Sequence, residues 1–201
     1  TLEPCCHYGK QPPCVNAIIN SKQISRVVVG VVDTDERVNS GGIQKLREAG
    51  IQVDVGVKSD EIRESLKAYL HYKSNMRPYV VAKIGLSQDG IYSVHGENIS
   101  LTSEKAQLHA HTLRGQSQCI IVGSRTVRVD DPQLTIRDGS DGPQPLVVVF
   151  DSKGVLNKSY RCFQNPHLII TSKNSDKTFW DQNRIKYKVT KTLDEAMRYL
   201  H

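Results

Sequence analysis

The sequence predicts an α/β protein, because runs typical of strands alternate with segments of helical periodicity. Residues 26–32 (RVVVGVV) form a continuous β-branched run, which is typical of a strand buried on both faces. In 41–50 (GGIQKLREAG) the apolar residues recur at helical spacing, and Gly50 is a stop signal. Residues 51–57 (IQVDVGV) alternate as a strand. A strand–helix–strand unit of this kind implies parallel pairing with a right-handed crossover.

Two further helices complete the first domain. We expect a short helix at 15–20, with Ala17 and Ile18 facing inward. We also expect an amphipathic helix at 60–75, whose apolar positions are Ile62, Leu66, Tyr69 and Leu70 and whose first residues are acidic, which suits a helix N-terminus.

Pro78 marks the start of a second domain, because proline cannot continue a helix. The predicted domains therefore cover 1–76 and 77–201. The second domain has its own series of elements, with a helix at 102–114 and strands at 79–84, 118–123, 146–150, 168–171 and 185–189. A last helix begins at Thr192, where Glu195 three residues later forms a capping box.

The composition narrows the possible functions. Of the 201 residues 38% are hydrophobic, and no apolar run reaches the roughly 18 residues of a membrane-spanning helix. The net charge is +6, but Lys and Arg are scattered and aromatic content is 6%, so nucleic-acid binding is disfavoured. Five cysteines, an odd number, favour a reducing cytoplasm over a secreted disulfide framework. The chain starts inside a motif, so we expect a fragment of a longer protein.

The most informative motif is EPCCHYGKQPPC at 3–14. Cys5 and Cys14 each follow a proline, which partly fixes the backbone that carries a thiolate ligand. Two thiolates can supply half of a tetrahedral zinc shell, and zinc deaminases share H-x-E followed by P-C-x-x-C. The alternatives are a structural zinc site in a non-enzymatic domain and two free thiols. We expect the third ligand and the general acid/base Glu upstream of Thr1.

Three motifs extend this interpretation: TLEPCCHYGKQPPC at 1–14, KIGLSQDG at 83–90 and GSRTVRVDDPQLTIR at 123–137. Their order and content resemble the bifunctional riboflavin-biosynthesis deaminase/reductase family over nearly the whole chain. The resemblance implies the later part of a cytidine-deaminase-like zinc domain, followed by a dihydrofolate-reductase-like α/β reductase domain. It implies zinc-dependent hydrolytic deamination of a phosphorylated pyrimidine and then NADPH-dependent reduction of its ribosyl group to ribityl. The implied cofactors are Zn²⁺ and NADPH.

The resemblance also implies site residues in both domains. In the first, Cys5 and Cys14 are the metal ligands, and the expected substrate contacts are His7, Lys10 and Asp33. In the second, the expected cofactor contacts are Gly85, Ser100, Thr126, Asp130 and Ser152, and the expected substrate contacts are Lys83, Asn98, Arg114, Leu134 and Arg137. The residues alone also allow plainer interpretations, in which the arginines and His7 are exposed surface residues and Lys83 extends from a strand end.

Two departures from the family pattern matter. Residues 33–36 (DTDE) replace Asp-Pro-Asn-Pro, and the added negative charge would disfavour an anionic substrate. Ser100 replaces a tryptophan beside the cofactor, so one alternative is a deaminase whose reductase domain is a non-catalytic scaffold. Another alternative is a nucleic-acid-binding deaminase relative. We expect a small-molecule substrate, no membrane partner and assembly into homo-oligomers.

Overall fold

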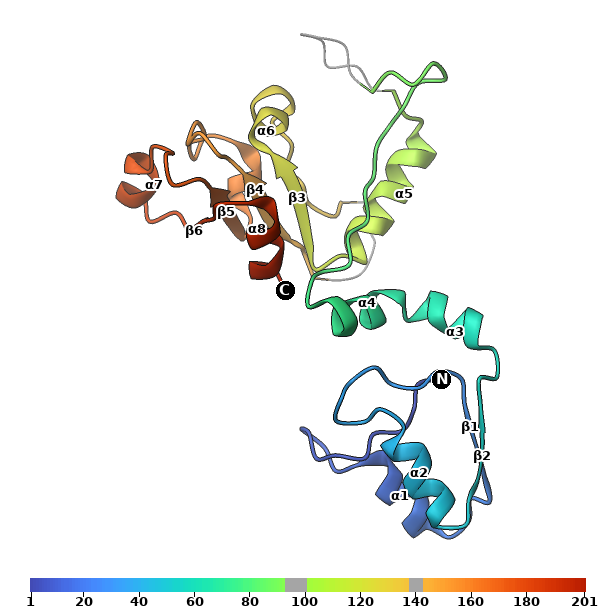
Figure 1. The fold of residues 1–201 in the computed structure, drawn as a ribbon. Coiled ribbons are helices and arrows are strands. Elements are labelled where there is room, and N and C mark those ends of the chain that lie inside the picture. Colours follow the sequence, from blue (N-terminus) through green and yellow to red (C-terminus); the bar gives the residue numbers. More distant parts are fainter. Residues whose placement is uncertain (93–100, 138–142) are drawn as a thin grey trace. The chain divides into compact units, whose positions relative to one another are not determined.

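The computed structural model describes residues 1–92, 101–137 and 143–201. The chain divides into two compact units (Figure 1). Unit 1 comprises 1–80 and 197–201, and unit 2 comprises 81–196. None of the helices in the described residues is long and apolar enough to cross a membrane.

Unit 1 contains a parallel pair of strands with two helices on one face (Figure 1). Its elements are α1 (Cys14–Ser21), β1 (Arg26–Val29), α2 (Gly41–Glu48), β2 (Gln52–Val55), α3 (Ser59–Ser65) and α4 (Lys67–Asn75). The pairing of β1 with β2 is parallel, with Arg26 opposite Gln52 and Val29 opposite Val55. The small core joins α1, both strands and α2 through Val15, Val29, Ile43, Leu46, Ile51 and Val53. The predicted strand–helix–strand unit is confirmed.

Three local predictions in unit 1 were wrong. The strand predicted at 26–32 ends at Val29, and Val28 is 45% exposed, so the strand buries one face only. Ala17 is exposed, because α1 turns Val15 toward the core instead. The helix predicted at 60–75 is divided at Leu66, whose φ of −102° and ψ of 9° leave helical geometry. No proline or glycine signals this break in the sequence.

Unit 2 is built on a four-stranded parallel sheet in the order β3-β4-β5-β6. The elements are α5 (Glu104–Gly115), β3 (Cys119–Gly123), α6 (Ser124–Asp130), β4 (Leu146–Phe150), η1 (Arg161–Gln164), β5 (His167–Thr171), α7 (Thr178–Gln182), β6 (Tyr187–Val189) and α8 (Leu193–Tyr199), whose last three residues belong to unit 1. The core lies between the sheet and the segments around α6, η1 and α7, and contains Val127, Val147, Val149, Phe163, Ile169 and Trp180. This arrangement confirms the predicted α/β class.

The strand predicted at 79–84 does not form. Val80, Val81 and Ile84 are 58%, 59% and 62% exposed, and no described strand pairs with them. A strand needs a partner for its backbone groups, so β-propensity alone does not produce one. The residues after β3 form α6, which buries the side chain of Val127 completely.

The predicted capping box at the start of α8 is present in a slightly shifted form. The Thr192 hydroxyl accepts a hydrogen bond from the Glu195 N–H at 3.1 Å. The Glu195 carboxylate accepts from the Lys191 N–H at 2.8 Å, one residue before the cap. Both contacts satisfy backbone donors at the helix start.

Candidate functional site

Cys5 and Cys14 lie against each other in unit 1. Cys14 is the first residue of α1, and its N–H donates a hydrogen bond to Cys5 Sγ at 3.3 Å. Two effects of Cys5 raise the pKa of Cys14: the larger is the hydrogen bond between the two side chains, and the smaller is charge repulsion between them. A divalent cation would relieve that repulsion by taking both sulfurs as thiolates. The pair fits two positions of a tetrahedral metal shell. Among the described residues no group of three or more potential ligands is assembled around a metal position.

His7 and Lys10, the expected substrate contacts of the same loop, differ in exposure. Lys10 is exposed, with its ammonium group available to an anion. His7 is half-buried, and its Nδ1 is a buried polar atom without a hydrogen-bond partner among the described residues. Such an atom carries a desolvation cost unless a ligand satisfies it, which suits a contact residue.

Glu3 organises this region, and the sequence did not single it out. The residue is only 4% exposed, and its carboxylate accepts four backbone N–H groups from two segments far along the chain. Ser40 and Gly42 donate at 2.9 Å, Ile43 at 3.1 Å and Asp33 at 3.3 Å. Glu3 therefore ties the cysteine loop to the start of α2 and to the loop after β1.

Gly42 permits this close approach. A Cβ at Gly42 would lie 2.1 Å from the carbonyl oxygen of Pro4, well inside contact distance. The sulfur of Cys6 also donates to the carbonyl of Arg37 at 3.4 Å, and the Lys45 ammonium donates to the carbonyl of Cys6 at 3.2 Å. The cysteine loop and the loop after β1 are thus joined at several points.

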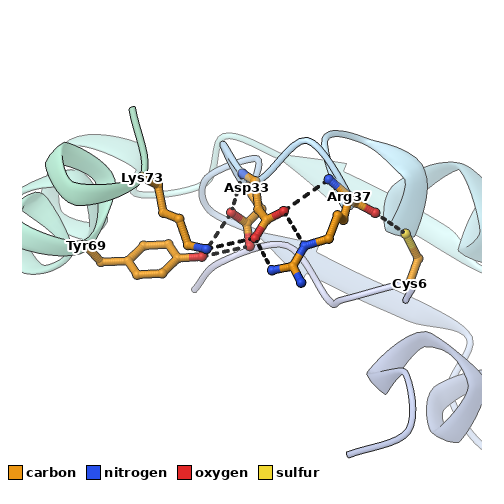
Figure 2. A network of polar contacts seen from close by, with 6 residues as sticks. Cys6, Asp33, Arg37, Tyr69 and Lys73 are labelled. Carbon is orange, nitrogen blue, oxygen red and sulfur yellow. Dashed lines mark hydrogen bonds and ion pairs between the residues drawn. The ribbon is translucent and has the colours of Figure 1, made fainter. Parts of the chain in front are cut away.

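Asp33, the expected pocket residue, is buried and held from two sides. Its Oδ1 accepts the Asp35 N–H at 2.9 Å, and the Tyr69 hydroxyl from α4 lies 3.2 and 3.3 Å from its two oxygens (Figure 2). Burial and the neighbouring Asp33 carboxylate raise the pKa of Tyr69 to about 12. Tyr69 therefore stays a hydrogen-bond donor to Asp33 at neutral pH.

Asp35, a second acidic residue of the loop after β1, forms ion pairs with two basic side chains. Asp35 accepts from the Arg37 guanidinium at 2.9 and 2.6 Å and from the Lys73 ammonium at 2.9 Å (Figure 2). The Arg37 guanidinium, and then Lys73, hold the pKa of Asp35 well below its usual range. Two cations balance the charge of Asp35, which weakens the expected repulsion of an anionic substrate.

In unit 2 the expected cofactor contacts lie at or near the carboxyl ends of the strands. Thr126 and Asp130 are exposed on α6, directly after β3, and Ser152 is exposed two residues after β4. An added Cβ at Gly85 would lie 2.9 Å from Thr102 Cγ2, so a side chain there would displace a neighbour. Ser100, the fifth expected contact, lies outside the described residues.

The expected substrate contacts of unit 2 form one local cluster and one separate residue. Arg114 of α5 donates to the carbonyl of Thr135 and so fixes the loop that carries Leu134 and Arg137. Leu134 is 8% exposed, whereas Arg137 is exposed and donates to Gln133 Oε1 at 3.0 Å. Lys83 is exposed on the segment that forms no strand. Asn98 lies outside the described residues.

Two hollows lined by described residues bear on the candidate site. One of about 310 Å³ lies at the carboxyl ends of β4, β5 and β6 and includes Ser152. The other, of about 560 Å³, lies in unit 1 between Val32, Ile43, Arg47 and Val55 and includes none of the expected site residues. Open α/β sheets bind ligands at the carboxyl ends of their parallel strands. The smaller hollow is therefore the stronger candidate for a ligand-binding site.

Comparison with known proteins gives consistent results. The family model of the RibD C-terminal domain matches residues 78–201. The chain is 46% identical over 158 residues to the riboflavin biosynthesis protein RibD of Chlamydia muridarum, covering 77% of this chain and 42% of that protein. It is 34% identical over 179 residues to RibD of Escherichia coli K12, covering 83% of this chain and 48% of that protein.

Solved structures agree with these relatives. A diaminohydroxyphosphoribosylaminopyrimidine deaminase/5-amino-6-(5-phosphoribosylamino)uracil reductase from Thermotoga maritima superposes with a TM-score of 0.85 at 31% identity, covering 100% of this chain and 57% of that one. RibD of Acinetobacter baumannii gives a TM-score of 0.85 at 30% identity, with the same coverage. The chain spans about half the length of the curated relatives it matches.

Proposed function

This chain belongs to the RibD C-terminal domain family, and from that membership we propose that it acts in riboflavin biosynthesis as part of a bifunctional deaminase/reductase. The observation that carries the proposal is the family match over 78–201, which includes the whole parallel sheet of unit 2. In this proposal 77–201 form the reductase domain and 1–76 belong to the deaminase domain. The substrate is a phosphorylated pyrimidine.

In this proposal unit 2 binds NADPH. When bound, NADPH supplies the hydride, and the protein supplies position and electrostatics. We assign the exposed Thr126, Asp130 and Ser152 to the cofactor, because they follow β3 and β4 at the sheet edge where ligands bind in this architecture. The close approach of Gly85 to Thr102 leaves room there for backbone but not for a side chain.

Substrate binding in the proposed reductase uses positive charge around a firmly held loop. Arg137 presents a planar guanidinium that can donate two parallel hydrogen bonds to a phosphate. Arg114 orients that loop by its bond to the Thr135 carbonyl, and the buried Leu134 anchors it. Lys83 is also assigned to the substrate, to which it would offer a compact cation. Asn98 is assigned to the substrate as well, to which it would offer a side-chain amide.

Unit 1 offers the metal-binding part of the proposed deaminase. Cys5 and Cys14 would hold Zn²⁺ as thiolates, and their adjacency supports this assignment. When bound, zinc supplies Lewis-acid activation of the attacking water. Within the chain, Glu3 holds the loop of Cys5 against the loop of Asp33, and Tyr69 keeps the Asp33 carboxylate in place for the substrate. His7 and Lys10 would complete the substrate contacts.

The test is a turnover assay with the full-length protein. NADPH absorbance is followed with and without 5-amino-6-(5-phosphoribosylamino)uracil, and ammonia release is followed with the diamino precursor. We expect NADPH loss that depends on the uracil substrate, at one equivalent per substrate. Ammonia release without any NADPH loss would contradict the reductase proposal and favour a scaffold role for unit 2.

A further inference from the structure

We propose that Asn165 and Gln144 are positioning residues of the proposed reductase, which hold the loop 131–137 so that Arg137 can bind the phosphate group of the pyrimidine substrate. Both amides act through Arg137 and do not themselves contact the substrate. This inference rests on the reductase function proposed above, and it adds two residues to which that function assigns no role.

The loop contains a residue in an unfavourable backbone conformation. Leu134 has a φ of 57°, which lies in the left-handed region that favours glycine. A residue with a Cβ keeps this conformation only where the surrounding structure holds it, and such residues are concentrated at ligand-binding sites. The Leu134 side chain is 8% exposed and belongs to the core of unit 2, which holds the loop at one point. Side chains from elsewhere in the chain hold the backbone on both sides of it.

Asn165 holds the backbone directly before Leu134. Its side-chain amide donates a hydrogen bond to the carbonyl oxygen of Gln133 at 3.1 Å. The Oε1 atom of Gln133 in turn accepts a hydrogen bond from the Arg137 guanidinium at 3.0 Å. Asn165 therefore fixes the backbone of the residue whose side chain orients the guanidinium of Arg137.

Gln144 holds the backbone on the other side of Leu134. Its Oε1 accepts the Ile136 N–H at 2.8 Å, and its Nε2 donates to the Ile136 carbonyl at 3.2 Å. A side-chain amide can pair with both backbone groups of one residue in this way, because it carries a donor and an acceptor. Ile136 directly precedes Arg137, so Gln144 fixes the backbone from which the Arg137 side chain extends.

The sequence holds both amides at firm points of the fold. Asn165 and Pro166 come directly before β5, and Gln144 and Pro145 come directly before β4. Proline restricts the residue before it to extended conformations, and Asn165 has a φ of −103° and a ψ of 165°. Because β4 and β5 are parallel neighbours, their amino ends lie at the same edge of the sheet. The two amides thus reach the loop from one edge of the sheet.

The first experiment measures the steady-state kinetics of NADPH consumption by the full-length protein and its Asn165→Ala variant. We expect the KM for the deaminated pyrimidine to rise about five-fold, as for the loss of one hydrogen bond, with kcat and the KM for NADPH unchanged. Asn183→Ala is the matched control, because the Asn183 amide also donates to a backbone carbonyl, that of Phe179 at 2.8 Å, at the end of α7. It should leave all three constants unchanged.

Gln144→Ala removes two hydrogen bonds from the loop and provides an independent variant. We expect it to raise the KM for the deaminated pyrimidine about ten-fold, again without a change in kcat or in the KM for NADPH. A variant that had lost the fold of unit 2 would change all three constants together.

The second experiment determines whether the two amides act through Arg137. Asn165→Ala and Gln144→Ala are each combined with Arg137→Gln, which removes the guanidinium. We expect neither to raise the KM further in that background, because the group that they position is absent, whereas a merely structural role would weaken binding in both backgrounds.

Two results would overturn this inference and leave the reductase function standing. One is an equal KM for the deaminated pyrimidine in Asn165→Ala and Asn183→Ala. The other is the same fold rise in KM with and without Arg137. A wild-type protein that consumes no NADPH with the deaminated pyrimidine would overturn both this inference and the proposed reductase function.

Discussion

A buried carboxylate organises the candidate site in each unit, but the two act over different distances along the chain. Glu3 in unit 1 accepts N–H groups from Asp33, Ser40, Gly42 and Ile43, which lie 30 to 40 residues later. The Asp151 carboxylate in unit 2 accepts from Gly154 and Leu156, three and five residues later. One carboxylate therefore holds separate segments together, and the other shapes a single turn.

This difference predicts how far the structural effect of removing each carboxylate extends within its unit. The cysteine loop and the Asp33 loop share Glu3, so loss of that side chain affects the metal ligands and the pocket together. The sheet edge of unit 2 is also tied by Thr171 and Ser172, so loss of Asp151 affects mainly the turn that presents Ser152.

The largest expected effect comes from Glu3→Ala. It leaves four N–H groups without their charged acceptor, and three of these hydrogen bonds are buried, so we expect the free energy of unfolding of this region to fall by about 3–5 kcal/mol. The measurement is amide hydrogen exchange of Gly42 and Ile43 in the full-length protein, together with its zinc content. Glu36→Gln removes an exposed carboxylate from the same region and serves as the control. Unchanged protection at both amides in Glu3→Ala would contradict the long-range role.

A smaller and more local effect is expected from Asp151→Ala. The variant loses one buried and one partly buried hydrogen bond, so we expect the free energy of unfolding to fall by about 2 kcal/mol, with the effect confined to the turn at 152–156. Chemical denaturation and amide exchange across unit 2 would measure it. Loss of protection throughout β4 and β5, as broad as that in Glu3→Ala, would remove the contrast between the units.

The smallest effect concerns the pH dependence of Tyr69. Its pKa of about 12 in the folded protein lies above the ordinary value of about 10, so the folded state holds this proton more tightly. The corresponding stability is complete below pH 10 and is lost as the pH rises toward 12. Tyr69→Phe should lack this alkaline loss, which a thermal unfolding series would detect.

Tyr187 in unit 2 is a useful comparison for that series. A hydrogen bond to the exposed Asp181 is the main cause that raises the pKa of Tyr187. Tyr187→Phe should therefore change the alkaline profile less than Tyr69→Phe, because burial is the main cause at Tyr69. The reverse order would contradict the burial of the Tyr69 hydroxyl in solution.

Patterns within short stretches of sequence were sufficient to predict many of the helices and strands. The β-branched run at 26–32 and the helical spacing at 41–50 predicted a parallel pair that the structure contains. Spacing could not show that 79–84 would lack a strand partner, because pairing depends on residues elsewhere in the chain. The break at Leu66 and the helix α6 likewise come from packing rather than from a local signal.

The candidate site shows the same limit. The Pro-Cys repeats pointed to Cys5 and Cys14, and the structure brings these two together. Glu3 gave no such signal, because its partners are backbone groups that any sequence provides. Tyr69 was visible only as an apolar position of a helix, and its hydroxyl contact with Asp33 becomes apparent only after the chain has folded.

The most direct test of two chemistries on two separate units is a separation of function in the full-length protein. Cys5→Ser and Arg137→Gln are compared with wild type for ammonia release, NADPH consumption and bound zinc. We predict that Cys5→Ser lowers ammonia release and zinc affinity by about 100-fold or more, yet consumes NADPH normally when given the deaminated pyrimidine. Arg137→Gln should show the reverse pattern at a low concentration of the deaminated pyrimidine, because it loses a contact to the substrate phosphate. Normal ammonia release and full zinc content in Cys5→Ser would contradict the account.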